Sequence, residues 1–490
     1  MLTKLTRRIA SASLMMAGSA LPALAQAAAT PVPNKGDTAW MIVATLLVLM
    51  MSIPGLALFY GGLVRSKNML SVLTQVFAIV SLAGIMWAFF GYSLAFTNGG
   101  ALNDFVGGFS KAFLKGVDAT TVAATFSNGV VIPEYIYMAF QMTFAMITPA
   151  LIVGAFAERI KFGALMLFTI LWSVLIYYPI AHMVWYWGGP DAFGDAAKAV
   201  AAATDAAAKT AAQAKLDEVM ADAGLIFKWG ALDFAGGTVV HINAGVAGLV
   251  GCLILGKRIG YGRELMAPHS LVMTMIGAAL LWVGWFGFNA GSALEANGTA
   301  VLAFVNTMVA TCAAALSWLL VEWLLKGKPS LLGMVSGAVA GLVAVTPAAG
   351  VAGPIGAIVL GLLSGALCFV FVSYVKNAFG YDDSLDVFGI HCVGGILGAI
   401  LTGVLADPSL GGAGIVDYVA KPGEAAAGEF VLATQVLAQL KAVALTIVWS
   451  GVGSAILFKL VDLVVGLRVS TEDERMGLDI AEHGERAYNL

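Results

Sequence analysis

Residues 233–248 read DFAGGTVVHINAGVAG, and residues 383–398 read DSLDVFGIHCVGGILG. In each stretch an aspartate precedes a histidine by eight residues, and glycines follow that histidine by four and seven residues. An ionisable side chain within an apolar run is costly in a bilayer, so His241 and His391 are candidate functional residues. Two such histidines in matching frames predict an internal repeat that forms one pathway, by which a small polar substance crosses a membrane.

The composition is typical of a membrane protein. Hydrophobic residues make up 60% of the 490 residues and charged residues 11%, which is too little polar surface to cover a soluble globule of this length. The net charge of -3 argues against a nucleic-acid partner. The sequence predicts an all-α polytopic membrane protein in a lipid bilayer, with eleven transmembrane helices of which the eighth is short. The apolar windows lie near residues 40–62, 71–96, 134–156, 162–181, 232–256, 270–290, 299–325, 331–346, 354–375, 387–404 and 431–464.

The N-terminus and the arginines predict the orientation of the chain. Residues 1–25 have the pattern of a secretory signal peptide, with basic residues before a short apolar stretch and the sequence Ala23-Leu24-Ala25 at its end. Cleavage there leaves the N-terminus outside a bacterial inner membrane, and an odd number of spans then places the C-terminus in the cytoplasm. The arginines beyond this segment fall on connections that the topology makes internal, as the positive-inside rule requires. An uncleaved anchor is the alternative, which the short apolar stretch disfavours.

Two segments lie outside the predicted spans. Residues 191–226 are rich in alanine with interspersed charges, and they predict an external insertion that is helical or partly disordered. The charged residues 467–490 form an internal tail, which is either a disordered end or a docking and regulatory segment. Residues 38–466 then make up the transmembrane transporter domain.

The predicted topology makes the repeat an inverted one. The helix of Asp233 starts outside and the helix of Asp383, five spans later, starts inside, so spans 1–5 and 6–10 form halves of opposite orientation. Eight helical residues rise about 12 Å, so the two imidazoles should lie within roughly 6 Å of each other along the membrane normal. The glycines after each histidine are expected to allow close helix packing.

The two aspartates are interpreted as helix caps, because eight helical residues turn each of them about 80° away from its histidine. For Asp383 the cap is the preferred interpretation. Asp233, at the outer mouth, has two open interpretations: a cap alone, or a cap that also attracts a cation to the mouth.

Aromatic residues gather near the outer ends of the third, fourth and sixth predicted spans. Taken singly, each is typical of the aromatic belt at a membrane interface. Together with one serine hydroxyl they could form a cation–π cage for a compact, alkylammonium-like cation. The residues are Phe140, Phe144, Trp185, Trp285, Phe288 and Ser292.

Strings along most of the chain resemble one known family. They are GGLVRSKN (61–68), GAFAERIKFG (154–163), YYPIAHMVW (177–185), LDFAGGTVVHINA (232–244), GWFGFNAGS (284–292), GKPSLLG (327–333), DVFGIHCVGG (386–395) and IVWSG (447–451). These strings closely resemble the bacterial ammonium transporters of the Amt/Rh/Mep superfamily. The resemblance runs from about residue 38 to the C-terminus, and residues 191–226 are the main departure from it.

The resemblance implies a fold, an assembly and a set of site residues. It implies a homotrimer of eleven-helix subunits with one narrow pore in each. The tail after Gly466 resembles the family's regulatory tail, which implies contacts with a neighbouring subunit and with a PII-type signal protein. The matched positions, by role, are Phe140, Trp185, Ser292 and Asp233 for the outer recruitment site, Phe144 and Phe288 for the phenylalanine gate, and His241 and His391 for the pore histidines.

The residues and the resemblance lead to one hypothesis for the function. Ammonium is captured at the outer aromatic site, loses a proton before the narrow apolar part, and passes as ammonia along the histidine pair, which could relay the proton separately. Two other functions stay open: an ammonium sensor coupled to PII signalling, and a channel for a neutral gas such as carbon dioxide. The sequence has no nucleophile elbow, phosphate-binding loop or metal-ligand cluster, so we expect neither an enzyme nor a cofactor or metal site.

Overall fold

The computed structural model describes residues 31–421, 424 and 426–488. The chain divides into two units, residues 1–32 and residues 33–490, and all the helices and strands named below belong to the second. The predicted signal peptide, residues 1–25, lies outside the described residues.

Eleven helical segments of the described chain are long and apolar enough to cross a membrane, by length and composition. This number confirms the prediction, including the short eighth span. The segments are Lys35–Leu63 (α2 Lys35–Met50 and α3 Ala57–Leu63), Ser66–Phe96 (α4 Met69–Met86 and α5 Tyr92–Phe96), Glu134–Phe156 (α6), Phe162–Trp185 (α7 Phe162–Trp172 and α8 Tyr178–Trp185), Gly237–Leu255 (a wide helical turn Gly237–Ile242, then α12 Asn243–Leu255), Leu271–Gly291 (α13), Gly298–Lys326 (α14), Leu331–Ala348 (α15 Leu331–Val345), Pro354–Phe379 (α16 Pro354–Val370 and α17 Lys376–Phe379), Phe388–Leu405 (a wide helical turn Phe388–Cys392, then α18 Val393–Leu405) and Leu432–Val465 (α19).

The remaining elements are short or lie at the two ends of the helix bundle. They are the helices α9 (Gly189–Ala202), α10 (Ala206–Ala221), α11 (Leu225–Lys228), α20 (Thr471–Met476) and α21 (Leu478–His483), and the antiparallel strand pairs β1 (Val122–Ala124) with β2 (Val131–Pro133) and β3 (Val416–Asp417) with β4 (Ala426–Ala427).

Polar side chains explain where several spans begin. Ser270, Asn297 and Ser330 precede α13, α14 and α15, and each side chain accepts a hydrogen bond from a backbone amide of the following first turn. Gly327 ends α14 in the left-handed conformation, with φ of 81°, which suits a residue without Cβ. The connection from Gly327 to Ser330 is short, so α14 and α15 pack side by side.

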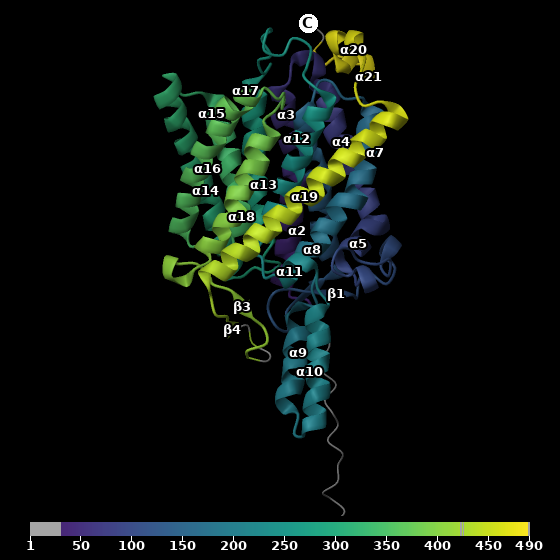
Figure 1. Ribbon diagram of the computed structural model, residues 1–490, viewed down its shortest axis with the longest axis vertical. Helices are drawn as coiled ribbons and strands as arrows, with labels where there is room; N and C mark the ends of the chain where they lie inside the picture. Colours follow the sequence, from purple (N-terminus) through teal and green to yellow (C-terminus); the bar gives the residue numbers. More distant parts are fainter. Residues whose placement is uncertain (1–30, 422–423, 425, 489–490) are drawn as a thin grey trace, which may run out of the picture. The chain divides into compact units, whose positions relative to one another are not determined.

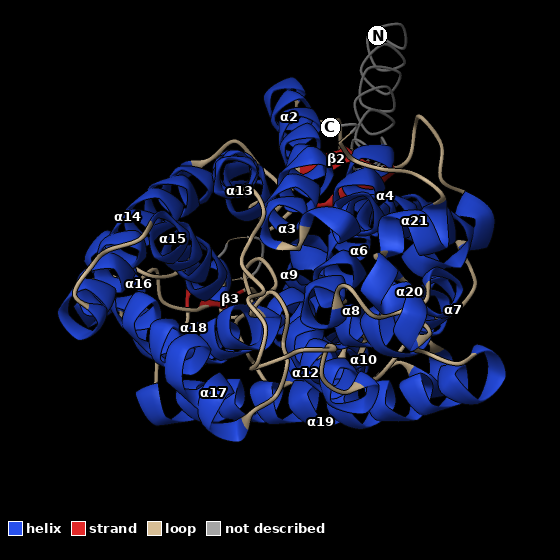
Figure 2. Ribbon diagram, turned by 90° about the horizontal axis from the view of Figure 1, so that it is seen from above, coloured by secondary structure: helices blue, strands red, loops and turns tan. Residues whose placement is uncertain are grey.

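The two halves of the predicted repeat form two groups of helices. Figure 2 shows α13, α14, α15, α16 and α18 on one side and α4, α6, α7 and α8 on the other. The histidine segments meet closely: a Cβ on Gly245 would lie 2.5 Å from the backbone nitrogen of Cys392, and a Cβ on Gly395 would lie 3.1 Å from Ile242. This contact is reciprocal, as an inverted repeat with glycines for close packing predicts.

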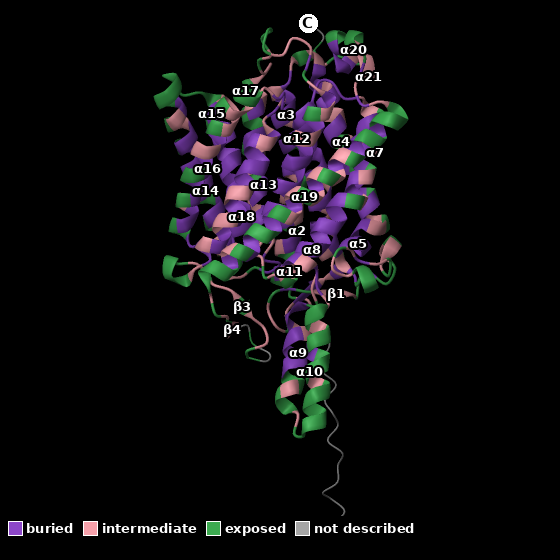
Figure 3. Ribbon diagram, in the orientation of Figure 1, coloured by how far each residue is buried: buried purple, intermediate pink, exposed green. Residues whose placement is uncertain are grey.

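Large apolar side chains lie exposed on the outward faces of the helices. A soluble protein would not expose such faces, whereas a lipid bilayer would cover them. Figure 3 shows the buried residues in the interior of the bundle and exposed residues along its outer helices. The exposed residues include Leu316, Leu320 and Leu324 on α14 and Val448, Val452 and Ile456 on α19, each more than half exposed.

The alanine-rich insertion is a hairpin of two helices, α9 and α10. It projects at one end of the bundle, and the tail helices α20 and α21 lie at the other (Figure 1). Phe193 and Ala197 of α9 and Leu216 of α10 are buried, whereas most residues of α10 are exposed. Of the two forms predicted for this segment, the structure has the helical one.

The bundle resumes before the predicted end of the insertion at residue 226. Ala223 is fully buried, and Asp222 anchors this stretch. Residues 222–226 therefore belong to the bundle, and the projecting hairpin is shorter than residues 191–226. The carboxylate of Asp222 accepts hydrogen bonds at 2.7–3.0 Å from three side chains, those of Asn98, Asn103 and Tyr186.

The tail is folded against its own chain. Asn68, just before α4, accepts a hydrogen bond from the backbone amide of Leu478 at 2.8 Å. Asp479 accepts one from the backbone amide of Ser71, also at 2.8 Å. The first turns of α4 and α21 therefore cap each other. The described part of the tail is therefore folded rather than a disordered end, and a docking or regulatory role stays a prediction.

Candidate functional site

The carboxylate of Asp233 caps the segment that carries His241. It also accepts a hydrogen bond from the hydroxyl of Thr238. Gly236 has φ of 111°, a left-handed conformation that turns the chain so that the following amides converge on this carboxylate. The predicted cap is therefore confirmed. The amides that donate, at 2.6–3.2 Å, are those of Gly236, Gly237, Thr238 and Val239.

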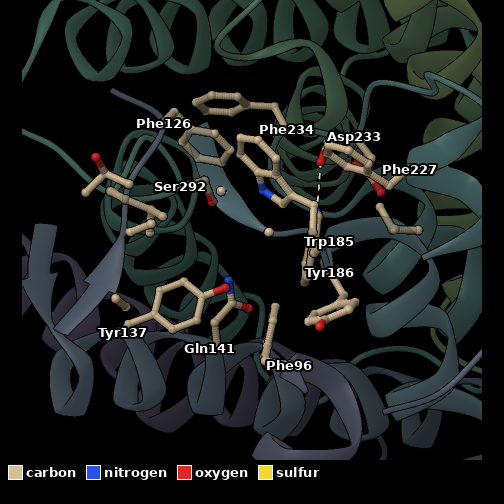
Figure 4. A pocket seen from close by; sticks show the side chains of 18 of the residues that line it. Phe96, Phe126, Tyr137, Gln141, Trp185, Tyr186, Phe227, Asp233, Phe234 and Ser292 are labelled. Atoms are coloured by element: carbon tan, nitrogen blue, oxygen red, sulfur yellow. Dashed lines mark hydrogen bonds between the residues drawn. The ribbon is translucent and has the colours of Figure 1, made fainter. Parts of the chain in front are cut away.

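A cavity of about 370 Å³, which we call the vestibule, opens at the end of the bundle where Asp233 lies. Figure 4 shows the aromatic side chains that surround it, together with Asp233 and Ser292. The indole nitrogen of Trp185 donates to the backbone carbonyl of Asp233 at 3.0 Å, which fixes the ring in the vestibule wall. The hydroxyl of Ser292 donates to the carbonyl of Phe288 at 2.8 Å, so its lone pairs are left to accept a hydrogen bond.

Two phenyl rings separate the vestibule from the interior. Phe144 lines the vestibule, and its ring stacks on that of Phe288 with centroids 4.2 Å apart and an angle of 28° between the planes. Trp185 meets Phe144 edge-on, with centroids 5.6 Å apart. Phe140 is fully buried and does not line the vestibule; its ring lies against Phe144 at 5.1 Å. Of the predicted recruitment residues, Trp185, Ser292 and Asp233 thus come together, and Phe140 lies behind Phe144.

The two histidines meet beneath the phenyl pair. Their Nδ1 atoms lie 3.2 Å apart and their ring centroids 5.3 Å apart, as the repeat geometry predicts. Trp285 stacks on His241 at 5.4 Å, and its indole nitrogen donates to the hydroxyl of Thr346 at 2.9 Å. Nε2 of His241 is buried and has no hydrogen-bond partner among the described residues.

A second, much smaller cavity lies beside the histidine pair. Its volume of about 10 Å³ is room for about one water-sized molecule. Phe288 lines this cavity and Phe144 lines the vestibule, so the phenyl pair divides the two. Apart from the imidazoles and the indole of Trp285 the lining is hydrocarbon, sulfur and phenyl: Met51, Leu56, Phe59, Ile147, Leu151, Val240, Leu281, Phe288 and Val339.

Sequence reasoning does not find several polar residues that line the vestibule, among them Glu134, Tyr137 and Gln141 of α6. Oε1 of Gln141 is buried and has no partner among the described residues. The signal that could have found them is their spacing, since residues 134, 137, 141 and 144 lie on one face of a helix.

The matching aspartate, Asp383, caps the other histidine segment. Its carboxylate accepts hydrogen bonds from the backbone amides of Val387 at 3.1 Å and Phe388 at 2.8 Å, which confirms the predicted cap. Burial and the neighbouring Asp386 raise the pKa of Asp383 to about 6, although Lys376 and the two amides act in the opposite direction. This cap is therefore closed in on all sides, whereas that of Asp233 borders the vestibule.

Buried charges close the end of the bundle where Asp383 lies. Arg258 donates to Asp382 through its side chain at 2.8–2.9 Å and to Glu158 at 3.3 Å, and Arg65 donates to Glu158 at 2.7 Å. The side chains of Glu158 and Asp382 are fully buried. Burial alone would raise the pKa of Glu158, but Arg258 and Arg65 lower it below its usual value. Both carboxylates are therefore held in their charged form.

Eleven apolar helices, a vestibule at one end and a buried imidazole pair beneath it define a multi-pass membrane protein with a polar site inside its helix bundle. Comparisons with known proteins identify the family. The sequence profile of the Ammonium Transporter Family matches residues 39–488. The chain belongs to this family.

Individual relatives match along nearly their whole length. An ammonium transporter from Bacillus subtilis is 44% identical over 456 residues, which cover 92% of this chain and 98% of that relative. An ammonium transporter from Aquifex aeolicus is 45% identical over 458 residues, covering 93% of this chain and 94% of that relative. The crystal structure of Mep2 from Saccharomyces cerevisiae has a TM-score of 0.72 and 30% identity, covering 89% of this chain and 91% of that one.

Proposed function

We propose that this chain carries ammonium across a bacterial inner membrane: the cation is captured in the vestibule, loses a proton, and passes as ammonia along the histidine pair. One observation carries the proposal. It is the buried imidazole pair beneath a stacked phenyl pair, at the foot of an aromatic vestibule. Membership of the ammonium transporter family supports the choice of substrate.

The vestibule suits a small cation that donates hydrogen bonds. The indole of Trp185 offers an aromatic surface, and such rings contribute about 0.5–2 kcal/mol to cation binding. The lone pairs of Ser292 accept from the cation, and the carboxylate of Asp233 supplies a negative charge in the same wall. Phe140 contributes through Phe144, whose ring it supports.

The phenyl pair makes deprotonation the condition for passage. Ring centroids 4.2 Å apart leave no room for a hydrated ion between Phe144 and Phe288, and the cavity beyond is small and mostly apolar. Moving a bare cation into such surroundings costs several kcal/mol. Ammonium can lose its charge by losing a proton, whereas potassium cannot. Selectivity therefore needs no filter based on ionic size.

The histidine pair matches the hydrogen bonding of ammonia. Because the two Nδ1 atoms lie 3.2 Å apart, one of them donates and the other accepts. With both rings neutral, one Nε2 is then an acceptor and the other carries a hydrogen. Ammonia both donates and accepts hydrogen bonds, so it fits a pair of rings that offers one donor and one acceptor. The same alternation could relay the proton separately.

The proposal includes the orientation and the partners of the chain. The vestibule faces outward after removal of the signal peptide, and the tail lies in the cytoplasm, where it contacts a neighbouring subunit of a homotrimer and a PII-type signal protein. The exposed apolar faces of α14 and α19 offer surface for lipid and for neighbouring subunits. The mutual capping of Asn68 with Leu478 and of Asp479 with Ser71 supports a regulatory tail, because it couples the tail to the second span.

Truncation after Gly466 tests the role of the tail. We expect trimers to assemble, with ammonium transport changed or PII association lost, as measured on native gels, by flux into liposomes and by pull-down. A tailless protein that keeps both normal transport and PII association would contradict a regulatory role.

Acidic substitutions of the histidines test the proposed pathway. His241→Asp or His391→Glu places a fixed negative charge in the pore and lowers the cost of an ion inside it. Proteoliposomes carrying either variant should pass potassium, whereas wild type should not. His241→Asn is the matched control, because it replaces the ring without adding charge. Well-assembled acidic variants that neither pass potassium nor change ammonium conductance would show that the histidines do not set selectivity.

A further inference from the structure

One wall of the vestibule is a face of α6 that runs from a carboxylate to the phenyl pair. Glu134, Tyr137, Gln141 and Phe144 all line the cavity. Glu134 stands in the first turn of α6, and the ten residues from there to Phe144 rise about 15 Å. The vestibule therefore has, besides Asp233, a fixed anionic group at the end of α6 away from Phe144.

A primary ammonium group already sits on this carboxylate. Nζ of Lys111 contacts Oε1 of Glu134 and lies 5.6 Å from the centroid of the Tyr92 ring. The hydroxyl of Tyr92 donates to the same Oε1 at 2.8 Å. All three side chains line the vestibule. A carboxylate and an aromatic ring thus hold a cation of the same chemical kind as the proposed substrate.

The two partners of this ion pair are held with different firmness. The side chain of Glu134 is 4% exposed and is fixed by Tyr92, whereas that of Lys111 is 35% exposed. The backbone amide of Lys111 donates to the hydroxyl of Ser93 at 3.0 Å, so its ammonium group can move without the backbone. A buried carboxylate that loses its partner is costly, which favours its occupation by another cation.

We propose that Glu134 and Tyr92 form a second cation subsite in the vestibule, which takes ammonium and small primary alkylammonium ions and for which the side chain of Lys111 competes. The identity of the ion rests on the proposed function, whereas the position of the subsite rests on the contacts of Lys111. Glu134 and the recruitment residues line the same cavity, so an ion held at the subsite raises the cation concentration near the recruitment residues.

Lys111→Met is the direct test, because it removes the competing ammonium group and keeps an apolar side chain of similar length. Equilibrium dialysis of the purified full chain with radiolabelled methylammonium should give two ions per chain for Lys111→Met and one for wild type. The half-saturating ammonium concentration for transport should fall roughly three- to tenfold. Adding Glu134→Gln should return binding to one ion, and adding Trp185→Leu should remove the other.

Lys115→Met is the matched control, since it removes the same charge from an exposed position four residues along the chain. Simple loss of positive charge would affect both variants alike and would not change the number of ions bound. A folded Lys111→Met protein that binds only one ion overturns the subsite. If the methionine variant does not fold, Lys111→Gln is tested in its place. Wild-type protein that binds no methylammonium contradicts the proposed function instead, and in that case a single ion bound by Lys111→Met still supports the subsite.

Discussion

The two histidine segments begin with the same aspartate cap, but the two caps lie in different surroundings. The carboxylate of Asp233 accepts five hydrogen bonds and borders a vestibule of about 370 Å³. Asp383 accepts hydrogen bonds from two backbone amides and is buried beside the charges of Asp386 and Lys376. The repeat therefore specifies where the histidines meet. Segments outside the repeat decide which end is open and which is closed.

Replacing Arg258 at the closed end should have the largest effect on stability. Arg258→Met leaves Asp382 and Glu158 buried without the partner they share, and breaking a buried ion pair from one side costs about 3–5 kcal/mol. Thermal unfolding of the detergent-solubilised protein should show a strongly lowered midpoint. Arg263→Met, at an exposed position of the same connection, is the control and should leave the midpoint nearly unchanged. Equal midpoints for both variants would mean that the buried ion pairs of Arg258 do not stabilise this end of the bundle.

Neutralising Asp383 should have a smaller effect that depends on pH. Because burial and Asp386 raise its pKa from 3.8 to about 6, the folded protein binds this proton more tightly than the unfolded chain does. The stability from this group is fully present below pH 3.8 and is lost as the pH rises through about 6. The total is about 1–3 kcal/mol.

Asp383→Asn should remove this dependence, so the difference in unfolding midpoint between wild type and variant should change between pH 4.5 and 7. Glu158 and Asp382 have lowered pKa values, so the stability that they give the folded protein is lost only as the pH falls below this range. Parallel midpoint curves for wild type and Asp383→Asn across this range would show that Asp383 does not titrate there.

Shortening the hairpin at the open end should have the smallest effect. Replacing residues 195–219 by a short glycine linker leaves Asp191 and Asp222 in place, and we expect transport to be unaltered and stability to change by less than about 0.5 kcal/mol. Asp222→Ala should instead cost about 1–3 kcal/mol, because three side chains lose a charged acceptor. Ammonium flux and unfolding midpoints measure both. A shortened protein that is less stable than Asp222→Ala would show that the hairpin supports the open end.

The sequence predicts those features that depend on local periodicity. The eleven spans follow from the length of the apolar runs, and the contact between His241 and His391 follows from their matching frames. Depth within the bundle does not follow from periodicity. Phe140 and Phe144 share a helix face, yet only Phe144 reaches the vestibule, because neighbouring helices decide which of the two is covered.

Contacts between distant segments are also beyond such reasoning. Asp222 looks like part of an alanine-rich surface helix, but its partners Asn98 and Asn103 come from a connection more than a hundred residues earlier. Lys111 and Glu134 meet only because a loop folds back over the start of α6. Neither residue lies in a pattern that predicts its partner.

The capping of α4 by Asp479 has a consequence for protein synthesis. Ser71 and Asp479 are 408 residues apart, so a ribosome that adds 5–20 residues each second makes the acceptor roughly 20–80 s after the amide that needs it. During that time the second span has been made but the start of its helix lacks its final cap. A chain that stops before Asp479 carries this exposed helix start, whereas a chain that includes Asp479 does not. Synthesis of the tail thus supplies the last hydrogen-bond acceptor at the start of the second span.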